Sequence, residues 1–396
     1  THIVNIAMAL KAEALTADIF KTDYTDNAGA LYDILKKYNG TPVGTFTGDE
    51  CLAGLSPIQG TELCSVTELM YSYEWLYAYT GDKKWAELLE LAAFNALPAT
   101  ISEDMWTHQY DQQSNQIACV QFPGKPIFRT NGGDAHLFGL EPNFGCCTAN
   151  FNQGWPKFAL SAFMYGENTV INVLPVPSNL KTDGFNINLE TEYPFKNSFK
   201  YTVNSDIEFE FKIRIPSFAE NVTVNGEKAD IGVLSFKITP CKNRTIEISY
   251  ETRPVLISRP YGLNTARCGS LVFSLPIKYE KRMHEYTNDG VERKFPYCDY
   301  ELIPQSDWNY AFCGDGLEAV RRTVGNSPFS ESEPPVVLKA SVCKIDWGYA
   351  DGYETVCDKI PHSTNPLSNP ETAELYPYGC AKLRMTEMPL VKNAPR

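Results

Sequence analysis

"SVTELMYSYEWLYAYTGD", residues 65–82, carries the clearest signal for a fold in this chain. Its apolar side chains recur at the spacing of one helix face, namely at Val66, Leu69, Met70 and Tyr73. Ser65 and Glu68 form a capping-box pattern, so the helix is expected to begin at Ser65 and to end at Gly81-Asp82. A second helix is predicted over 84–95. The short loop between these two helices predicts an antiparallel pair.

The residues before this stretch also predict helices. "VNIAMALKAEAL" (4–15) is dense in helix formers. "NAGALYDILKKY" (27–38) places Leu31, Ile34 and Leu35 on one face and stops at Asn39-Gly40. We therefore expect a helical region over 1–167. Because "THIVNIAMALK" starts inside such a layer without a leading cap, the chain is expected to begin partway through a helical domain.

Near Asn168 the pattern changes from helical spacing to alternation. "FNINLETEYP", "SFKYTVNSD" and "IEFEFKIRIP" are short alternating stretches bounded by turn residues, and Asn225-Gly226 is a hairpin signal among them. This predicts a β-sandwich over 168–290. "VVLKASVCKI" (336–345) predicts further strands in a C-terminal β-rich domain over 291–396. The expected fold class is therefore multidomain, helical first and β afterwards.

Composition argues against several classes of partner. The formal net charge is −13 and the basic residues are not clustered, which argues against binding to nucleic acid. No apolar run approaches the roughly 20 residues of a membrane span, and no signal peptide is visible, so a cytoplasmic location is expected. Most of the twelve cysteines are then expected to be reduced and buried. An aromatic content of 12% suits a carbohydrate partner, whose apolar faces stack on rings.

Four residues from two parts of the chain could form a metal site. Glu62 and Cys64 lie just before the expected helix, on extended backbone where alternate residues point the same way. Cys146 and Cys147 add two thiols, and Zn²⁺ accepts three thiolates and one carboxylate. Two ordinary alternatives stay open. The paired cysteines could be inert buried thiols, and Glu62 could be a solvated loop carboxylate or a partner of the helix dipole.

Other polar residues are candidates for catalysis or for binding a substrate. Glu50, in the loop "GDECL", could be a general acid, or it could be an ordinary loop carboxylate. The five histidines form no HxH or HExxH, so a histidine-based zinc site is not expected. His2 and His108 could bond sugar hydroxyls, or they could have surface or core roles. Tyr110, in "HQYDQQSNQ", is a third candidate substrate contact.

Three segments together resemble glycoside hydrolase family 127 and its relative family 146, the retaining β-L-arabinofuranosidases and similar enzymes. They are "GDECLAGLSPIQGTELCSVTELMYSYEWLY", "HQYDQQSNQ" and "NFGCCTANFNQGWPKF". The most specific element of the resemblance is Glu-x-Cys followed far downstream by Cys-Cys. The resemblance covers most of the chain and implies an (α/α)6 barrel followed by β-sandwich domains. It also implies that an N-terminal part of the barrel would precede the first residue.

The resemblance further implies roles for single residues. It implies a zinc ion held by Glu62, Cys64, Cys146 and Cys147. Cys146 matches the family's nucleophile, Glu50 its acid/base and His2 a histidine of the sugar pocket. The metal-bound thiolate would attack the anomeric carbon while Glu50 protonates the leaving oxygen, and water would then release the sugar with retention. The implied substrates are β-L-arabinofuranosides of plant-type glycans.

Two other functions remain open at this point. The chain could be a non-catalytic carbohydrate-binding or structural protein in which zinc only joins the helices. It could also be a glycosidase of the same fold acting on another sugar, such as another furanoside or an acidic pectic residue. A homodimer formed through the β-regions is also considered.

Overall fold

The computed structural model describes residues 2–121, 127–128 and 130–392. Helices follow one another in its N-terminal part: α1 (Ile3–Ala9), α2 (Ala12–Phe20), α3 (Asn27–Asn39), α4 (Leu63–Thr80), α5 (Lys83–Leu91), the π-turn η1 (Ala92–Ala96), α6 (Leu97–Ala99) and α7 (Cys146–Leu160). The stretch 4–15 thus forms parts of two helices rather than one. The helix expected over 84–95 is confirmed as α5 and its continuation into η1.

The helix expected at residues 65–82 is confirmed as α4, but it begins two residues early. Glu62 is its N-cap, with extended backbone (φ −66°, ψ 134°) and no capping bond from its side chain. The predicted capping box is wrong because Ser65 lies inside the first turn, where its hydroxyl donates to the Glu62 carbonyl at 2.7 Å. Cys64 is therefore helical, whereas the sequence indicated extended backbone. The helix ends before Gly81 (φ 67°), as expected.

Helix α3 ends at Asn39-Gly40 as predicted, but its buried face differs from the expected one. Tyr32 and Leu35 are buried, whereas Ile34 is 57% exposed. The ring of Tyr32 packs edge-on against that of Trp85 in α5, with centroids 5.6 Å apart. A large aromatic side chain therefore sets the rotation of α3, because it buries more apolar area than Ile34 would.

Strands replace helices from residue 163, so the expected change from α to β is confirmed. One sheet has the order β11-β10-β13-β8-β7-β6 and a second has the order β12-β9-β5-β4. Rings of Phe185 and Phe209, one from each sheet, stack with centroids 4.4 Å apart. The strands are β4 (Phe163–Tyr165), β5 (Thr169–Asn172), β6 (Ser178–Lys181), β7 (Phe185–Thr191), β8 (Ser198–Ser205), β9 (Phe209–Arg214), β10 (Glu220–Val224), β11 (Glu227–Lys228), β12 (Val233–Ile238) and β13 (Cys241–Glu251).

The hairpin expected at Asn225-Gly226 is confirmed between β10 and β11. Val224 pairs with Glu227, so the loop has two residues. Both have positive φ, 51° at Asn225 and 84° at Gly226. This is the backbone that favours Asn-Gly in two-residue hairpins.

A third sheet begins at β14 and has the core order β14-β15-β16-β24-β22-β21. The second β-region therefore begins between Glu251 and Pro254, before the limit expected at residue 290. The domain limits themselves stay predictions. The remaining strands are β14 (Pro254–Ser258), β15 (Leu263–Cys268), β16 (Leu271–Pro276), β17 (Tyr279–His284), β18 (Tyr286–Asn288), β19 (Val291–Arg293), β20 (Asp299–Pro304), β21 (Tyr310–Arg321), β22 (Val336–Asp346), β23 (Ser363–Pro366), β24 (Glu371–Pro377), β25 (Arg384–Met385) and β26 (Met388–Pro389).

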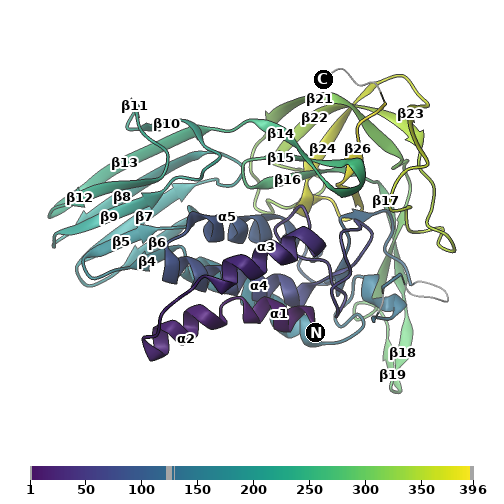
Figure 1. Cartoon of the computed structure of the whole chain (residues 1–396), viewed down its shortest axis with the longest axis horizontal. Coiled ribbons are helices and arrows are strands. Elements are labelled where there is room, and N and C mark those ends of the chain that lie inside the picture. The colour runs from purple at the N-terminus through teal and green to yellow at the C-terminus, as the bar shows by residue number, and fades with distance from the viewer. Residues whose placement is uncertain (1, 122–126, 129, 393–396) are drawn as a thin grey trace.

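The helices pack against both β-regions (Figure 1). Glu90 of α5 forms an ion pair with Arg214 of β9, and both side chains are at most 1% exposed. Asn95 of η1 donates to the Ser270 carbonyl and accepts from the Val272 amide at the start of β16. The described helices thus form a layer that contacts both β-regions, and a closed (α/α)6 barrel stays a prediction.

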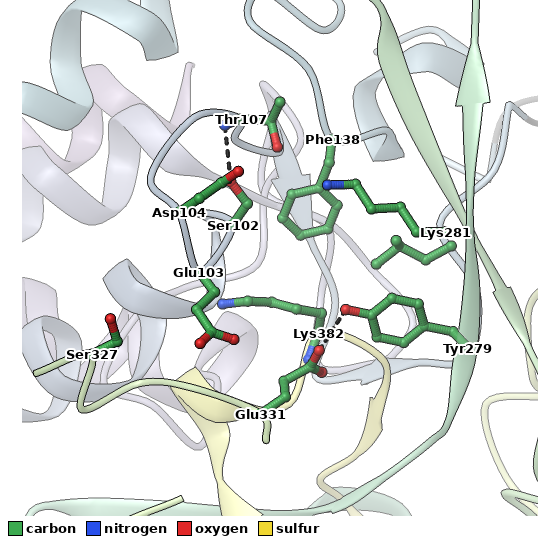
Figure 2. A pocket seen from close by; sticks show the side chains of 11 residues that line it. Ser102, Glu103, Asp104, Thr107, Phe138, Tyr279, Lys281, Ser327, Glu331 and Lys382 are labelled. Carbon is green, nitrogen blue, oxygen red and sulfur yellow. Dashed lines mark hydrogen bonds between the residues drawn. The ribbon is translucent and has the colours of Figure 1, made fainter. Parts of the chain in front are cut away.

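The loop Ser102–Thr107, the two-stranded sheet β17-β20 and the segment before β22 line an open cavity of about 430 Å³ (Figure 2). Within the described part of the chain, no helix is long and apolar enough to cross a membrane.

Candidate functional site

Three elements bring the predicted metal ligands together. Glu62 ends β1 (Thr61–Glu62), Cys64 lies in the first turn of α4, and the paired cysteines begin α7. The ligand atoms of Glu62, Cys64, Cys146 and Cys147 all lie within 4.8 Å of one another. Sγ of Cys147 is 3.3 Å from Sγ of Cys64 and 4.0 Å from Sγ of Cys146. The packing of α4 on α7 therefore brings together thiols that are far apart in the sequence.

Two helix N-termini converge on this cluster. Cys64 is the second residue of α4, and Cys146 and Cys147 are the first two of α7. The positive end of a helix dipole stabilises thiolate and carboxylate groups near it. Glu62 and Cys147 are fully buried, whereas Cys146 is only half-buried. One thiol of the pair is thus more accessible than the other.

The donor set fits a zinc ion. Zn–S bonds of about 2.3 Å in a tetrahedron place sulfur atoms about 3.8 Å apart, close to the sulfur distances of this cluster. Oε2 of Glu62 is buried and has no hydrogen-bond partner among the described residues, and Nε2 of His2 lies 3.9 Å from it. A buried carboxylate oxygen without a donor is costly unless a cation binds it.

Burial and the close spacing of ionisable groups shift the pKa values within the cluster. Burial, together with the charges of Cys146 and Glu50, raises the pKa of Glu62 to about 8. Hydrogen bonds from the Cys147 and Cys64 thiols lower the pKa of Cys146. Burial raises the pKa of Cys147. Among the three thiols, Cys146 therefore carries the negative charge most readily.

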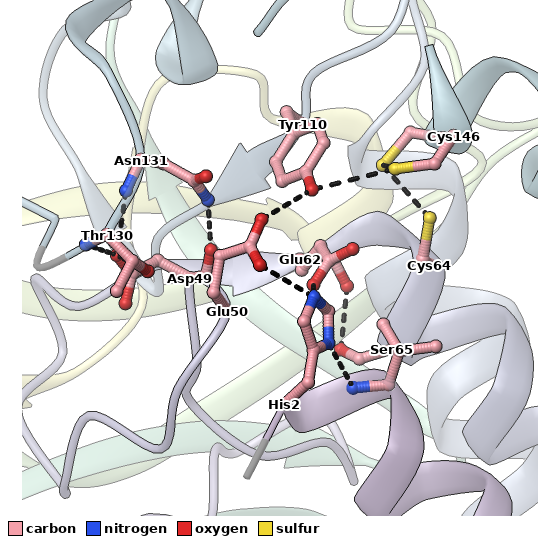
Figure 3. Close-up of polar contacts among 12 residues, drawn as sticks. His2, Asp49, Glu50, Glu62, Cys64, Ser65, Tyr110, Thr130, Asn131 and Cys146 are labelled. Atoms are coloured by element: carbon pink, nitrogen blue, oxygen red, sulfur yellow. Dashed lines mark hydrogen bonds and ion pairs between the residues drawn. The ribbon is translucent and has the colours of Figure 1, made fainter. Parts of the chain in front are cut away.

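Glu50 lies beside the cluster and is held by two side chains (Figure 3). Nε2 of His2 lies 2.7 Å from Oε2 of Glu50, and the Tyr110 hydroxyl donates to Oε1 at 3.0 Å. Nδ1 of His2 accepts from the Val4 amide, so in neutral His2 the proton is on Nε2 and points at Glu50. The same Tyr110 oxygen lies 3.6 Å from Sγ of Cys146. Tyr110 thus bridges the candidate acid/base and the candidate nucleophile.

A buried polar clamp holds the loop that carries Glu50. Oδ2 of Asp49 accepts from the amide and hydroxyl of Thr130, at 2.6 and 2.9 Å. The side-chain amide of Asn131 donates to the Asp49 carbonyl and, at 2.8 Å, to Oδ2 of Asp111. Asp111 pairs with Glu62 across β1 and β2 (Asp111–Gln112). Asn131 therefore connects the loop of Glu50 to strand β2, which pairs with the strand of Glu62.

His108 is placed differently from His2. Its Nε2 lies 3.0 Å from the Thr148 hydroxyl and 3.1 Å from the Leu140 carbonyl, and its Nδ1 is 3.2 Å from the Gln109 carbonyl. Burial lowers the pKa of His108, which favours the neutral ring. Its visible contacts orient the first turn of α7, and a direct contact with substrate stays a prediction.

Sequence reasoning identified the thiols but missed the clamp. "NGGD" (131–134) reads as an ordinary turn, and nothing local distinguishes Asn131 from any turn asparagine. Asp49 is next to Glu50, yet its role depends on residues about 80 positions downstream. The adjacency of Asp49 to the candidate acid was the one available signal.

Comparisons with known proteins show a similar sequence segment and a similar fold. Residues 170–238 match the family model described as the middle domain of GH127 β-L-arabinofuranosidase. The fold resembles a GH127 β-L-arabinofuranosidase from Geobacillus stearothermophilus T6, with a TM-score of 0.66 and 17% identity over 98% of this chain. It also resembles a GH127 β-arabinofuranosidase, with a TM-score of 0.64 and 16% identity over 100% of this chain. A third solved structure, titled glycoside hydrolase, matches with a TM-score of 0.61 and 14% identity over 99% of this chain.

This chain spans 60%, 61% and 66% of the length of those three structures. Comparison with curated protein sequences gives no match. The matched segment 170–238 covers β-strands, whereas the thiol cluster lies before it. The resemblance to glycoside hydrolase family 127 is confirmed: the chain carries the middle domain of that family and has the fold of its solved members.

Proposed function

We propose that this chain is a retaining glycoside hydrolase, with Cys146 as nucleophile, Glu50 as acid/base and β-L-arabinofuranosides as substrates. The observation that carries the proposal is the position of the Tyr110 hydroxyl, 3.0 Å from Glu50 and 3.6 Å from Cys146. An acid and a nucleophile that contact one hydroxyl can act on the same glycosidic bond. The choice of sugar is supported by two structurally similar proteins, a GH127 β-L-arabinofuranosidase and a GH127 β-arabinofuranosidase.

The residues Glu62, Cys64, Cys146 and Cys147 would hold the metal, and we propose Zn²⁺ because three sulfurs and one carboxylate suit it. Bound there, zinc would keep the thiols deprotonated and would moderate the reactivity of the sulfur. Cys147 is fully buried, so its task is to hold the ion. Cys146 is half-buried and can reach a substrate as well.

In the first step Sγ of Cys146 forms a bond to the anomeric carbon while the bond from that carbon to the leaving oxygen breaks. Glu50 gives its proton to that oxygen. In the second step Glu50 takes a proton from water, the water oxygen bonds to the anomeric carbon, and the carbon–sulfur bond breaks. Two inversions give net retention.

His2 and Tyr110 position the carboxyl group throughout. Nε2–H of His2 donates to Oε2 of Glu50, which leaves Oε1 and the Tyr110 hydroxyl free to exchange a proton with the substrate side. The hydrogen bonds run from the Cys146 thiol to Tyr110 and from Tyr110 to Glu50. Loss of the Cys146 proton along this path as the metal binds would leave a thiolate at Cys146 and an acid at Glu50, the pair that the first step needs.

Hydrolysis of p-nitrophenyl β-L-arabinofuranoside tests the proposal. Wild-type turnover is expected, with a loss of at least about 100-fold in Cys146→Ser and in Glu50→Gln. Cys51→Ser is the matched control, because Cys51 is an exposed thiol next to Glu50 in the same loop. Turnover that survives both substitutions at the site would rule out these roles.

A second candidate function is a structural metal site in a carbohydrate-binding protein. The burial of Glu62, Cys64 and Cys147 favours it, because a metal there would join β1, α4 and α7. It predicts bound zinc and a lower unfolding temperature in Cys147→Ser, with no turnover in the wild type.

A further inference from the structure

A cavity of about 430 Å³ lies behind the thiol site, and none of the residues proposed for catalysis lines it. It is lined by the loop Ser102–Thr107, by β17 and by the segment that precedes β22 (Figure 2). Its volume falls in the range of about 300–1,000 Å³ that is usual for small-molecule sites.

The cavity and the thiol site lie on two sides of one backbone pairing. The amides of His108 and Gly139 each donate to the other's carbonyl, at 2.9 and 3.0 Å. The His108 ring faces α7 through Thr148, whereas the neighbouring residues Thr107 and Phe138 line the cavity. Successive side chains on extended backbone point to opposite faces, so these are two separate sites.

Two buried polar groups at the cavity have unused hydrogen-bonding capacity. The Thr107 side chain is 1% exposed, and its hydroxyl has no hydrogen-bond partner among the described residues. In Figure 2 that hydroxyl is turned toward the Phe138 ring and the cavity. The ammonium of Lys382, 4% exposed, donates to the carbonyls of Pro98 and Gly379, at 2.8 and 3.1 Å, which leaves one of its three hydrogens. Buried groups of this kind normally find a partner. Both lie directly behind the cavity surface, so a ligand that displaces the wall slightly would stabilise them.

The charges around the cavity indicate a neutral ligand. Charged groups of both signs line it, namely the carboxylates of Glu103, Asp104 and Glu331 and the ammonium groups of Lys281 and Lys382. Several are already engaged, since Glu331 accepts from Tyr279 and Asp104 accepts from Ser102. A wall with both donors and acceptors suits hydroxyl groups, which are both, better than a phosphate or an organic cation.

Aromatic rings complete the lining. Phe138 and Tyr279 contribute rings on which the C–H face of a sugar can pack. A second hollow of about 320 Å³, lined by Trp155 and Phe329, shares Ser102, Glu103, Ser327 and Lys382 with the cavity. The two hollows form a continuous surface on which a chain could lie.

We propose that this cavity is a second carbohydrate site, which holds one neutral sugar residue of a glycan while the shared hollow holds the next. The choice of a glycan as ligand rests on the proposed function, and the location rests on the unpartnered Thr107 hydroxyl and the mixed lining.

Isothermal titration with methyl β-L-arabinofuranoside tests the site in a Glu50→Gln background, in which turnover does not interfere. Ser327 is exposed and lines the cavity, so Ser327→Trp would fill it without disturbing the core. The Glu50→Gln protein is expected to bind two sugars per chain, one at the thiol site and one in the cavity. Ser327→Trp is expected to weaken the cavity event at least about tenfold, whereas Ser341→Trp, at an exposed serine of β22, leaves both events unchanged. Thr107→Val is expected to weaken binding about fivefold without lowering the unfolding temperature, because it removes a buried hydroxyl that lacks a partner.

Binding of the methyl glycoside that is equal in Ser327→Trp and Ser341→Trp, or absent altogether, would overturn the second site. D-Galacturonate is the charged comparison. If it binds more tightly than the methyl glycoside, and if Ser327→Trp abolishes that binding, the proposed preference of the cavity for neutral sugars is overturned. Hydrolysis of the p-nitrophenyl glycoside by the wild type distinguishes the two proposals. Turnover with unchanged binding in Ser327→Trp contradicts only the second site, whereas binding without turnover contradicts only the proposed function.

Discussion

The phenol of Tyr110 donates a hydrogen bond to Oε1 of Glu50 at 3.0 Å, although the two residues are 60 positions apart. Tyr110 is 2% exposed and the Glu50 side chain is 30% exposed, so this bond lies at the boundary between the core and solvent. Burial raises the pKa of Tyr110 far above its ordinary value, and the phenol therefore stays a donor over the whole accessible pH range. The Glu50 carboxyl thus has a fixed partner between it and Cys146.

Tyr110→Phe is expected to lower kcat/KM about 10- to 100-fold, because a hydrogen bond to a charged group contributes about 1.5–3 kcal/mol. The loss should appear mainly in kcat, since the proposed task of Tyr110 concerns the proton rather than sugar binding. Tyr38→Phe, an exposed tyrosine of α3, is the control. Unchanged kinetics in Tyr110→Phe would contradict the bridge between Glu50 and Cys146.

Metal analysis tests the thiol cluster independently of turnover. About one zinc per chain is expected after gentle purification, falling to a small fraction in Cys147→Ser. Cys119→Ser is the matched control, because Cys119 is equally buried but lies outside the cluster. Chelation should lower the unfolding temperature of the wild type and leave that of Cys147→Ser unchanged. Equal zinc content in the two serine variants would argue against the cluster as the metal site.

Asn131→Ala is expected to reduce the free energy of unfolding by about 1–3 kcal/mol, since it leaves the buried Asp111 carboxyl without its donor. It should also lower turnover, because the Asp49 carbonyl next to Glu50 loses the same amide. Asn143→Gly keeps the positive φ of 65° and removes the donor to Oδ1 of Asn131 and the acceptor of the Gly132 amide, so it should cost less. Urea titrations of both variants measure the difference, and equal losses would show that Asn131 acts only as a loop residue.

Glu74 makes stability depend on pH. Burial raises its pKa to about 7, so between its ordinary value and 7 the folded chain binds a proton that the unfolded chain has lost. Stability from this group is therefore present at low pH and falls as the pH rises from about 4.5 to about 7, by at most about 3 kcal/mol. Glu74→Gln should flatten the pH dependence of unfolding in that window. Glu167→Gln, at an exposed position, should leave it unchanged.

The ion pair between Glu90 and Arg214 joins α5 to β9 away from water. Arg214→Met alone is expected to cost about 3–5 kcal/mol, because it leaves the buried Glu90 carboxylate without its cation and with only the Tyr193 hydroxyl as a donor. Adding Glu90→Leu should restore much of that loss, since two apolar side chains can replace a buried pair. A double variant no more stable than Arg214→Met would contradict this account of the pair.

Local pattern predicted much of the fold. Apolar spacing in 65–82 identified α4, and Asn225-Gly226 identified the β10–β11 hairpin, because each depends on residues close in sequence. The first turn of α4 was misjudged, since Ser65 is the better local cap, whereas backbone bonds from Glu62 to Gly48 and from Leu63 to Tyr110 start the helix two residues earlier. Ile34 was misjudged for the same kind of reason: only the position of Trp85 shows that Tyr32 faces inward.

The types of residue in the candidate site were readable from the chain alone, because three thiols and a carboxylate have few common uses besides binding a soft cation. The geometry was not readable. That α7 delivers Cys146 and Cys147 to the first turn of α4, that Tyr110 lies between Glu50 and Cys146, and that Asn131 clamps Asp49 all depend on how loops and helices pack. Hydrogen bonds across 36 to 83 positions follow from that packing, and no local spacing encodes it.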